Sequence, residues 1–139
     1  MEIVEAQADT VRIKTANGTT LTCQAVRQMP VQDLLLKLGF ADMLSRDAND
    51  ITTAMQHLTT AQQLDTARAA MALFNYTMAH GIVESPPAEA VAELRELGVA
   101  PDSLPALRAV WLNYLVLRDA AEAGEVVGII LGLTFKPAS

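Results

Sequence analysis

The residues best suited to chemistry in this chain are one cysteine, Cys23, and two histidines, His57 and His80. A cysteine becomes a nucleophile when a nearby basic group lowers its pKa. Cys23 lies on the apolar side of an alternating run, and no basic residue shares that side. Free cysteines in such a position behave as small buried hydrophobes. We therefore expect Cys23 to be a core residue and not a nucleophile.

A metal site would need histidine or cysteine ligands at short, regular spacing. His57 and His80 are far apart in the sequence, and neither belongs to a HxxxH, HExxH or Cys/His pattern. His80 also falls in the last turn of an expected helix, where the helix dipole stabilises an imidazolium without any ligand role. We predict no metal site and no cofactor.

Two acidic pairs have helical spacing, Glu89 with Glu93 and Asp119 with Glu122. General acid–base catalysis would require a histidine, lysine or serine beside them, and none accompanies either pair. The glycine-rich nucleotide motifs and the GxSxG motif of hydrolases are also absent from the sequence. We therefore place both pairs on solvated helix faces and predict a protein that has no catalytic residues and is not an enzyme.

The overall composition limits the class of protein further. A chain of 139 residues suits a single domain, and 51% hydrophobic with only 4% aromatic residues predicts an aliphatic core, which favours helices. Sixteen acidic against ten basic residues give a net charge of -6, which repels nucleic acids. The single cysteine and the acidic start, which lacks the basic flank of a signal peptide, lead us to expect a cytoplasmic protein.

Residues 10–26 have the pattern of a β-hairpin. Val11 and Ile13 alternate with basic residues, which is the period of a strand with one buried face. The pair Asn17-Gly18 follows and predicts a type I′ turn. A single hairpin is marginal in water, so its apolar face must lie on helices, or its edge must pair with another chain.

The rest of the chain, 30–135, has helical patterns, and we expect a flexible tail at 136–139. Thr59 or Thr60 with Gln62 or Gln63 predicts a capping box, and Gly81 and Gly98 predict helix ends. The expected elements are helices at 30–38, 59–81, 85–98 (capped by Ser85, with Pro86 next) and 101–124 (capped by Asp102 or Ser103), and a short helix or loop within 41–58. At 125–135 the β-branched residues favour a strand, and a short helix that docks on the bundle is the alternative that we prefer. The helix at 59–81 is expected to form the core through Leu64, Ala67, Met71, Phe74 and Met78.

These patterns predict a mainly α fold: a small bundle of about four to six helices with an N-terminal β-hairpin, in one domain spanning 1–139. The segment "AGEVVGIILGLTF" repeats glycine at every fourth position, the small-xxx-small spacing of closely packed membrane helices. Its apolar run of about 11 residues is too short for a membrane span, which needs about 20. The glycines either pack on the helix of Trp111 or form a surface for another chain.

Aromatic residues on the preceding helix extend this candidate surface, because Trp and Tyr are enriched at interface hot spots. The predicted interface consists of Trp111, Tyr114, Leu115, Gly124, Gly128, Ile129, Gly132 and Leu133. Through it we expect the chain to form a homo-oligomer and to contact a protein partner.

The order of four segments resembles that of the tail assembly chaperones of long-tailed bacteriophages, or of related prophage and gene-transfer-agent tail clusters. The segments are the hairpin "VRIKTANGTTLTCQAV", the helix start "MPVQDLLLKLG", the helix end "FNYTMAHGIVESPP" and the late "WLNYLVLRDAAEAGEVVGIILGL". The resemblance covers nearly the whole chain and implies a non-catalytic protein of the host cytoplasm. It would bind and solubilise the tape measure protein, assist tail tube assembly together with the tail tube protein, and be absent from the mature virion.

Two other hypotheses stay open. The chain could be a structural virion component, such as a tail completion or connector protein, or a small regulatory module that acts by protein–protein interaction. None of the three requires a cofactor, a nucleic acid or a membrane.

Overall fold

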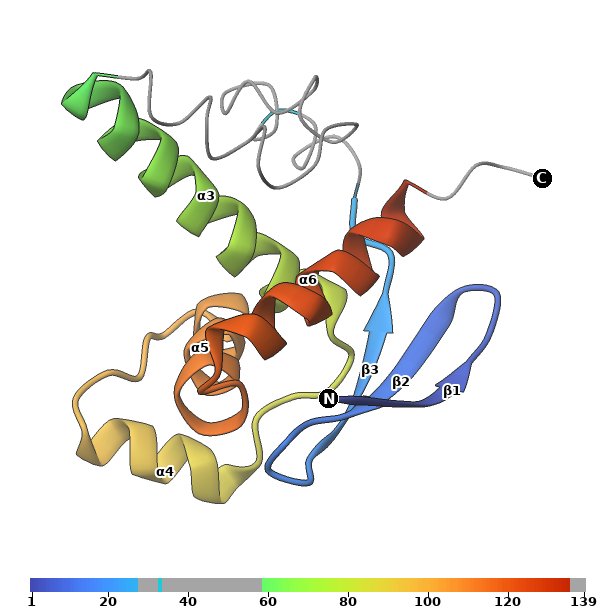
Figure 1. Ribbon diagram of the computed structural model, residues 1–139. Coiled ribbons are helices and arrows are strands. Elements are labelled where there is room, and N and C mark those ends of the chain that lie inside the picture. Colours follow the sequence, from blue (N-terminus) through green and yellow to red (C-terminus); the bar gives the residue numbers. More distant parts are fainter. Residues whose placement is uncertain (28–32, 34–58, 136–139) are drawn as a thin grey trace. The chain divides into compact units, whose positions relative to one another are not determined.

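The computed structural model describes residues 1–27, 33 and 59–135 (Figure 1). Of these residues 57% are helical and 15% are in strands, so the fold class is α+β. The prediction of a mainly α bundle of four to six helices with a hairpin is wrong, because the described part holds four α-helices and a three-stranded antiparallel sheet. The elements are β1 (Glu2–Ala6), β2 (Thr10–Lys14), β3 (Thr20–Gln24), α3 (Thr60–Gly81), α4 (Ala88–Glu96), α5 (Leu104–Trp111), the π-helical turn η2 (Leu112–Val116) and α6 (Ala120–Thr134).

The chain divides into two compact units. One consists of Met1–Arg27 with Asn75–Ser139, and the other is Gln28–Phe74. The predicted elements at 30–38 and within 41–58 lie outside the described residues, Asp33 excepted, and so does the tail at 136–139.

The second unit contains the first part of α3, which begins with the predicted capping box. The Thr59 N–H donates to Gln62 Oε1 at 2.9 Å, and the Gln62 N–H donates to Thr59 Oγ1 at 3.2 Å. The predicted core stripe of this helix is wrong at Leu64 and Met71, which are 55% and 59% exposed. In the last turns of α3, Met78 is fully buried, so this end of the helix contributes to the core.

The β2–β3 hairpin has the predicted apolar face. Ile13 pairs with Leu21 and Val11 with Cys23, and paired residues lie on the same side of a sheet. Ile13, Leu21 and Cys23 are fully buried, which confirms that this side faces the core.

The turn of the hairpin differs from the predicted type I′, which needs positive φ at both central residues. Among the described residues only Gly18 and Gly98 have positive φ, so Asn17 does not meet this condition. The Gly18 N–H donates to the Thr15 carbonyl at 2.9 Å, and the Thr15 N–H donates to the Thr19 carbonyl at 2.8 Å. These bonds describe a type I turn followed by a left-handed glycine, the usual alternative for a longer hairpin loop.

The strand β1 was not predicted. It pairs antiparallel with β2, with Glu2 opposite Lys14 and Glu5 opposite Arg12, and the register shifts between Ile3 and Glu5. All five of its residues are exposed, so it lacks the hydrophobic alternation that reveals a half-buried strand. The available signal was charge: two glutamates spaced to face the two basic residues of β2.

Helix α4 ends where the sequence predicts and starts later. Gly98 has φ of 73°, and the Val99 N–H donates to the Leu94 carbonyl at 3.1 Å, which confirms the glycine stop. The predicted cap at Ser85 is wrong, because α4 starts at Ala88 and Pro87 holds the N-cap position.

The single helix predicted over 101–124 is also wrong. Helix α5 is capped by Ser103, as predicted, but it passes into η2 and the chain then leaves helical geometry at Leu117, with φ of -109° and ψ of 65°. A new helix, α6, starts after Asp119, whose Oδ1 accepts from the Ala121 N–H at 2.8 Å. Gly124 therefore lies inside α6 and does not end a helix. The helical prediction for 125–135 is confirmed.

Helix α6 packs on β3 and is tied to the hairpin near both of its ends (Figure 1). Near its start, Glu122 Oε2 accepts from the Ala16 N–H at 3.0 Å and lies 3.3 Å from the α-ammonium of Met1. At its end, the Thr134 hydroxyl accepts from the Val26 N–H at 3.0 Å and donates to its own helix. Glu122 is 6% exposed, so the predicted solvated position of this carboxylate is wrong.

The end of α3 approaches α6 at a glycine. A Cβ added to Gly81 would lie 2.5 Å from Ile130 Cγ2 and 2.7 Å from Ile130 Cδ1. Ile130 is fully buried, so it has little room to move away. Gly81 therefore permits a close approach that no larger residue would allow without a shift.

Candidate functional site

The three glycines of α6 form one exposed face of that helix, which we call the glycine face (Gly124, Gly128 and Gly132). A Cβ added at any of them would meet no heavy atom within 4 Å in the described part of the chain. Their spacing places them opposite Val126 and Ile130, which are fully buried. Of the two interpretations of these glycines, packing on the helix of Trp111 is therefore wrong for the described residues.

The borders of the glycine face are apolar. The predicted interface residues Ile129 and Leu133 are half-buried, and so is Leu131. Phe135 follows the helix and is 36% exposed. Glu125 is the one charged residue between Gly124 and Thr134 in the sequence. The result is a smooth strip of helix backbone with aliphatic side chains along its borders.

Trp111 and Leu115 belong to a different surface, a pocket of about 430 Å³ that α4 also lines. Trp111 is 5% exposed and forms a buried part of this pocket, while Glu89, Glu93 and Arg118 contribute charged side chains. Tyr114 does not line this pocket and is 57% exposed. The structure thus distributes the predicted interface over the glycine face, this pocket and the separate side chain of Tyr114.

Cys23 is a core residue, as predicted. It is fully buried and forms an isolated antiparallel bridge with Ile82, next to the end of α3. Burial, together with a smaller contribution from the nearby carboxylate of Glu84, raises the pKa of the Cys23 thiol to about 12. A protonated, inaccessible thiol is a poor nucleophile.

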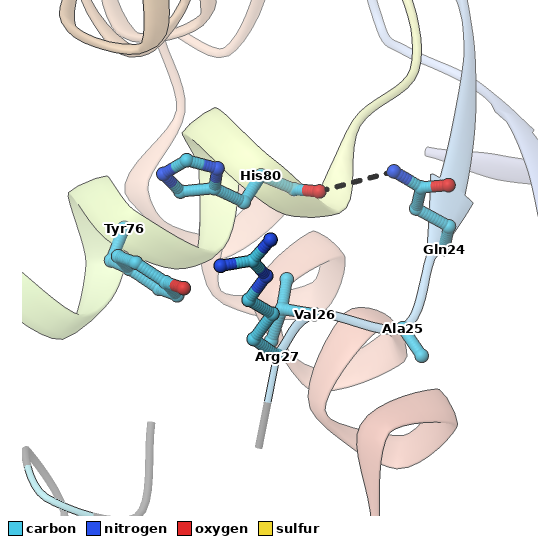
Figure 2. A pocket seen from close by; sticks show the side chains of 6 residues that line it. All are labelled: Gln24, Ala25, Val26, Arg27, Tyr76 and His80. Atoms are coloured by element: carbon cyan, nitrogen blue, oxygen red, sulfur yellow. Dashed lines mark hydrogen bonds between the residues drawn. The ribbon is translucent and has the colours of Figure 1, made fainter. Parts of the chain in front are cut away.

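A second pocket, of about 390 Å³, lies between the end of β3 and the last turns of α3 (Figure 2). The Tyr76 and His80 rings are stacked on one side, with centroids 4.4 Å apart and planes tilted by 39°. The Gln24 amide donates to the His80 carbonyl at 3.2 Å, and the side chain of Arg27 extends toward the two rings. The lining residues are Gln24, Ala25, Val26, Arg27, Tyr76 and His80.

The helix dipole alone would stabilise an imidazolium at His80, but the surroundings of this ring have the opposite effect. Desolvation lowers the pKa of His80, and the positive charges of Arg108 and Arg27 lower it further. Arg108 is held in place by a bond from its Nη1 to the Ala79 carbonyl, of 2.5 Å. Its buried Nε has no hydrogen-bond partner among the described residues.

Sequence reasoning missed this pocket. Arg27 and His80 are distant in the chain, and neither belongs to a motif. A local signal existed only for Tyr76 and His80, which are four residues apart and therefore neighbours on one helix face.

No group of three or more His, Cys, Asp and Glu side chains is arranged to hold a metal ion among the described residues. No helix in that part is both long enough and apolar enough to span a membrane. Comparisons of the chain with protein-family models, with curated proteins and with solved structures found no match.

Proposed function

We propose that this chain is a non-catalytic protein-binding module that acts as a tail assembly chaperone and holds a helical tape measure protein in solution before the tail tube assembles. The observation that supports a binding role is the open glycine face of α6. The assignment of the client and of the tail tube protein as partners depends on the resemblance of the four quoted segments.

The energetics of the glycine face favour a partner. A glycine inside a helix destabilises it by up to about 1 kcal/mol relative to alanine. Because no side chain in the described part approaches Gly124, Gly128 or Gly132, the fold of this part gains no contact in return. A partner helix would gain one, since glycines let two helix backbones approach closely and aliphatic borders pack against it.

The test is co-expression of the chain with the tape measure protein of its own tail gene cluster. We expect the client to stay soluble and to co-purify with the wild-type chain. Gly128→Leu should abolish co-purification, because the leucine would fill the glycine face at a position where an added Cβ meets no heavy atom within 4 Å in the described part of the chain. Ala92→Leu is the matched control, because Ala92 is an exposed residue of another helix, α4.

Circular dichroism should show that both variants are folded. A client that stays insoluble with the wild-type chain would contradict the chaperone function. Equal co-purification by Gly128→Leu and Ala92→Leu would contradict the role of the glycine face.

The virion-component hypothesis has its own test. Mass spectrometry of purified particles should not detect a chaperone, whereas a connector or completion protein would be present in fixed proportion to the tube. Light scattering of the free chain should show an oligomer if copies of this protein also pair with each other.

A further inference from the structure

The pocket of Figure 2 concentrates positive charge in an acidic protein. The chain has a net charge of -6, yet Arg27 and His80 both line this pocket, and Arg108 acts on His80 from α5. None of the lining residues is acidic. A positive charge on His80 beside these two arginines is unfavourable in the absence of a counter-charge.

No carboxylate neutralises Arg27 in the described part of the chain. The ion pairs found there join Arg12 to Glu5 and the α-ammonium of Met1 to Glu122, and both lie elsewhere. Arg27 is exposed at the end of the hairpin, and its guanidinium extends toward the Tyr76 and His80 rings, where it pairs with no carboxylate of the described residues. The pocket therefore presents positive charge that these residues leave unpaired.

We propose that this pocket binds an oxyanion, a carboxylate or a phosphate-type group carried by a small organic molecule. The guanidinium of Arg27 can bind such a group with two parallel hydrogen bonds. The Tyr76 hydroxyl and the His80 ring supply further donors, and Ala25 and Val26 supply an apolar wall for the carbon part of the ligand. A volume of about 390 Å³ lies within the range of small-molecule sites. This site is independent of the glycine face and of the chaperone function.

Binding should be coupled to protonation of His80. The groups that face this imidazole are Tyr76 on its own helix, Arg27 at the end of the hairpin and Arg108 on α5. The two arginines disfavour the imidazolium, and a bound anion would favour it, so the anion raises the pKa of His80. By linkage, the affinity for the anion must increase as the pH falls and His80 becomes protonated.

The experiment follows the His80 ring by NMR in the full chain during titration with sodium sulfate or sodium acetate, with sodium chloride at matched ionic strength as the screening control. Sulfate and acetate stay ionised near neutral pH and represent the phosphate-type and carboxylate groups. We expect saturable shifts with at least one probe, and tighter binding at about pH 6 than at about pH 8.

Two variants of equal charge test the assignment of the site. Arg27→Gln should weaken binding about tenfold or more, the equivalent of one lost charged hydrogen bond. Arg12→Gln, which removes the same charge from β2, should leave binding unchanged. His80→Gln should keep the site and remove the pH dependence of the affinity.

Each outcome decides the proposal. Saturation by sulfate alone identifies a phosphate-type ligand, saturation by acetate alone identifies a carboxylate, and saturation by both identifies a general oxyanion site. The proposal is refuted if chloride reproduces the shifts, if no probe saturates, or if Arg27→Gln and Arg12→Gln bind equally. Circular dichroism should confirm that the variants are folded.

Discussion

Replacing Gly81 by alanine tests the closest approach between α3 and α6. The new Cβ would lie 2.5 Å from Ile130 Cγ2, so one of the two elements must move by roughly 1 Å to reach ordinary contact distance. Ile130 is fully buried and β-branched, which leaves it few alternative rotamers. Overpacking of this kind costs about 1–3 kcal/mol.

A smaller effect of opposite sign accompanies this cost. Alanine is a better helix former than glycine by up to about 1 kcal/mol. The substitution gains less at position 81, because Gly81 is the last residue of α3. We therefore expect Gly81→Ala to lower the free energy of unfolding by about 1–2 kcal/mol. Urea denaturation followed by circular dichroism measures this change. Gly128→Ala is the matched control, because its Cβ meets open space and it should stabilise the protein by up to about 1 kcal/mol.

A double-mutant cycle isolates the contact. Ile130→Ala removes all three atoms that the new Cβ would meet, at its own cavity cost of about 2–5 kcal/mol. The double variant Gly81→Ala/Ile130→Ala should then be more stable than the sum of the two single effects by about 1 kcal/mol or more. Additive effects, or a Gly81→Ala variant as stable as Gly128→Ala, would refute the argument.

Three further predictions concern the buried polar groups that join the hairpin to the helices. Because burial raises the pKa of Cys23 to about 12 while an unfolded thiol ionises near 9.0, unfolding becomes more favourable as the pH rises between these values, and Cys23→Ala should reduce that dependence in alkaline urea titrations. A thiol reagent at neutral pH should modify the wild-type protein only as fast as it unfolds. Thr134→Val should destabilise the protein by about 1–3 kcal/mol in the same assay, because the buried Val26 N–H loses its acceptor, while Thr134→Ser keeps the hydroxyl and most of the stability. Glu122→Ala should lower the free energy of unfolding by about 1–3 kcal/mol, because the Ala16 N–H loses its acceptor. Glu122→Gln retains an acceptor and should cost less. Equal losses in the two variants would contradict a hydrogen-bonding role for Glu122.

Local signals in the sequence predicted those features that depend on a few neighbouring residues. The capping box at Thr59, the Ser103 cap and the stop at Gly98 each involve a side chain or a backbone angle within one helical turn. The alternation around Ile13 and Leu21 likewise predicted the buried side of the hairpin.

Features that depend on distant partners were not predictable in this way. The exposed strand β1 is defined by its pairing with β2, and its sequence has no apolar period of its own. Helical patterns on both sides of Leu117 are continuous, so the break there was hidden until the separate cap at Asp119 could be assigned.

The glycines illustrate the same limit. Spacing drew attention to Gly124, Gly128 and Gly132, which have open space around them, and not to Gly81, where space is needed. Whether a glycine meets another element depends on the tertiary packing of that element, which the residue's own neighbours do not encode. The candidate anion pocket is unpredictable for the same reason, since the end of a strand and the end of a helix must come together to form it.

The two hydrogen bonds that tie α6 to the hairpin also constrain the order of folding. One joins Ala16 to Glu122, which are 106 positions apart in the sequence, and the other joins Val26 to Thr134, which are 108 positions apart. During synthesis the hairpin leaves the ribosome long before α6 exists, so β3 at first lacks the helix that packs on it. Contacts this distant also slow folding, because a long loop must close before they form. The sheet of this protein should therefore become stable only after the last helix is made, and ribosome-bound chains that lack α6 should be sensitive to protease in the hairpin.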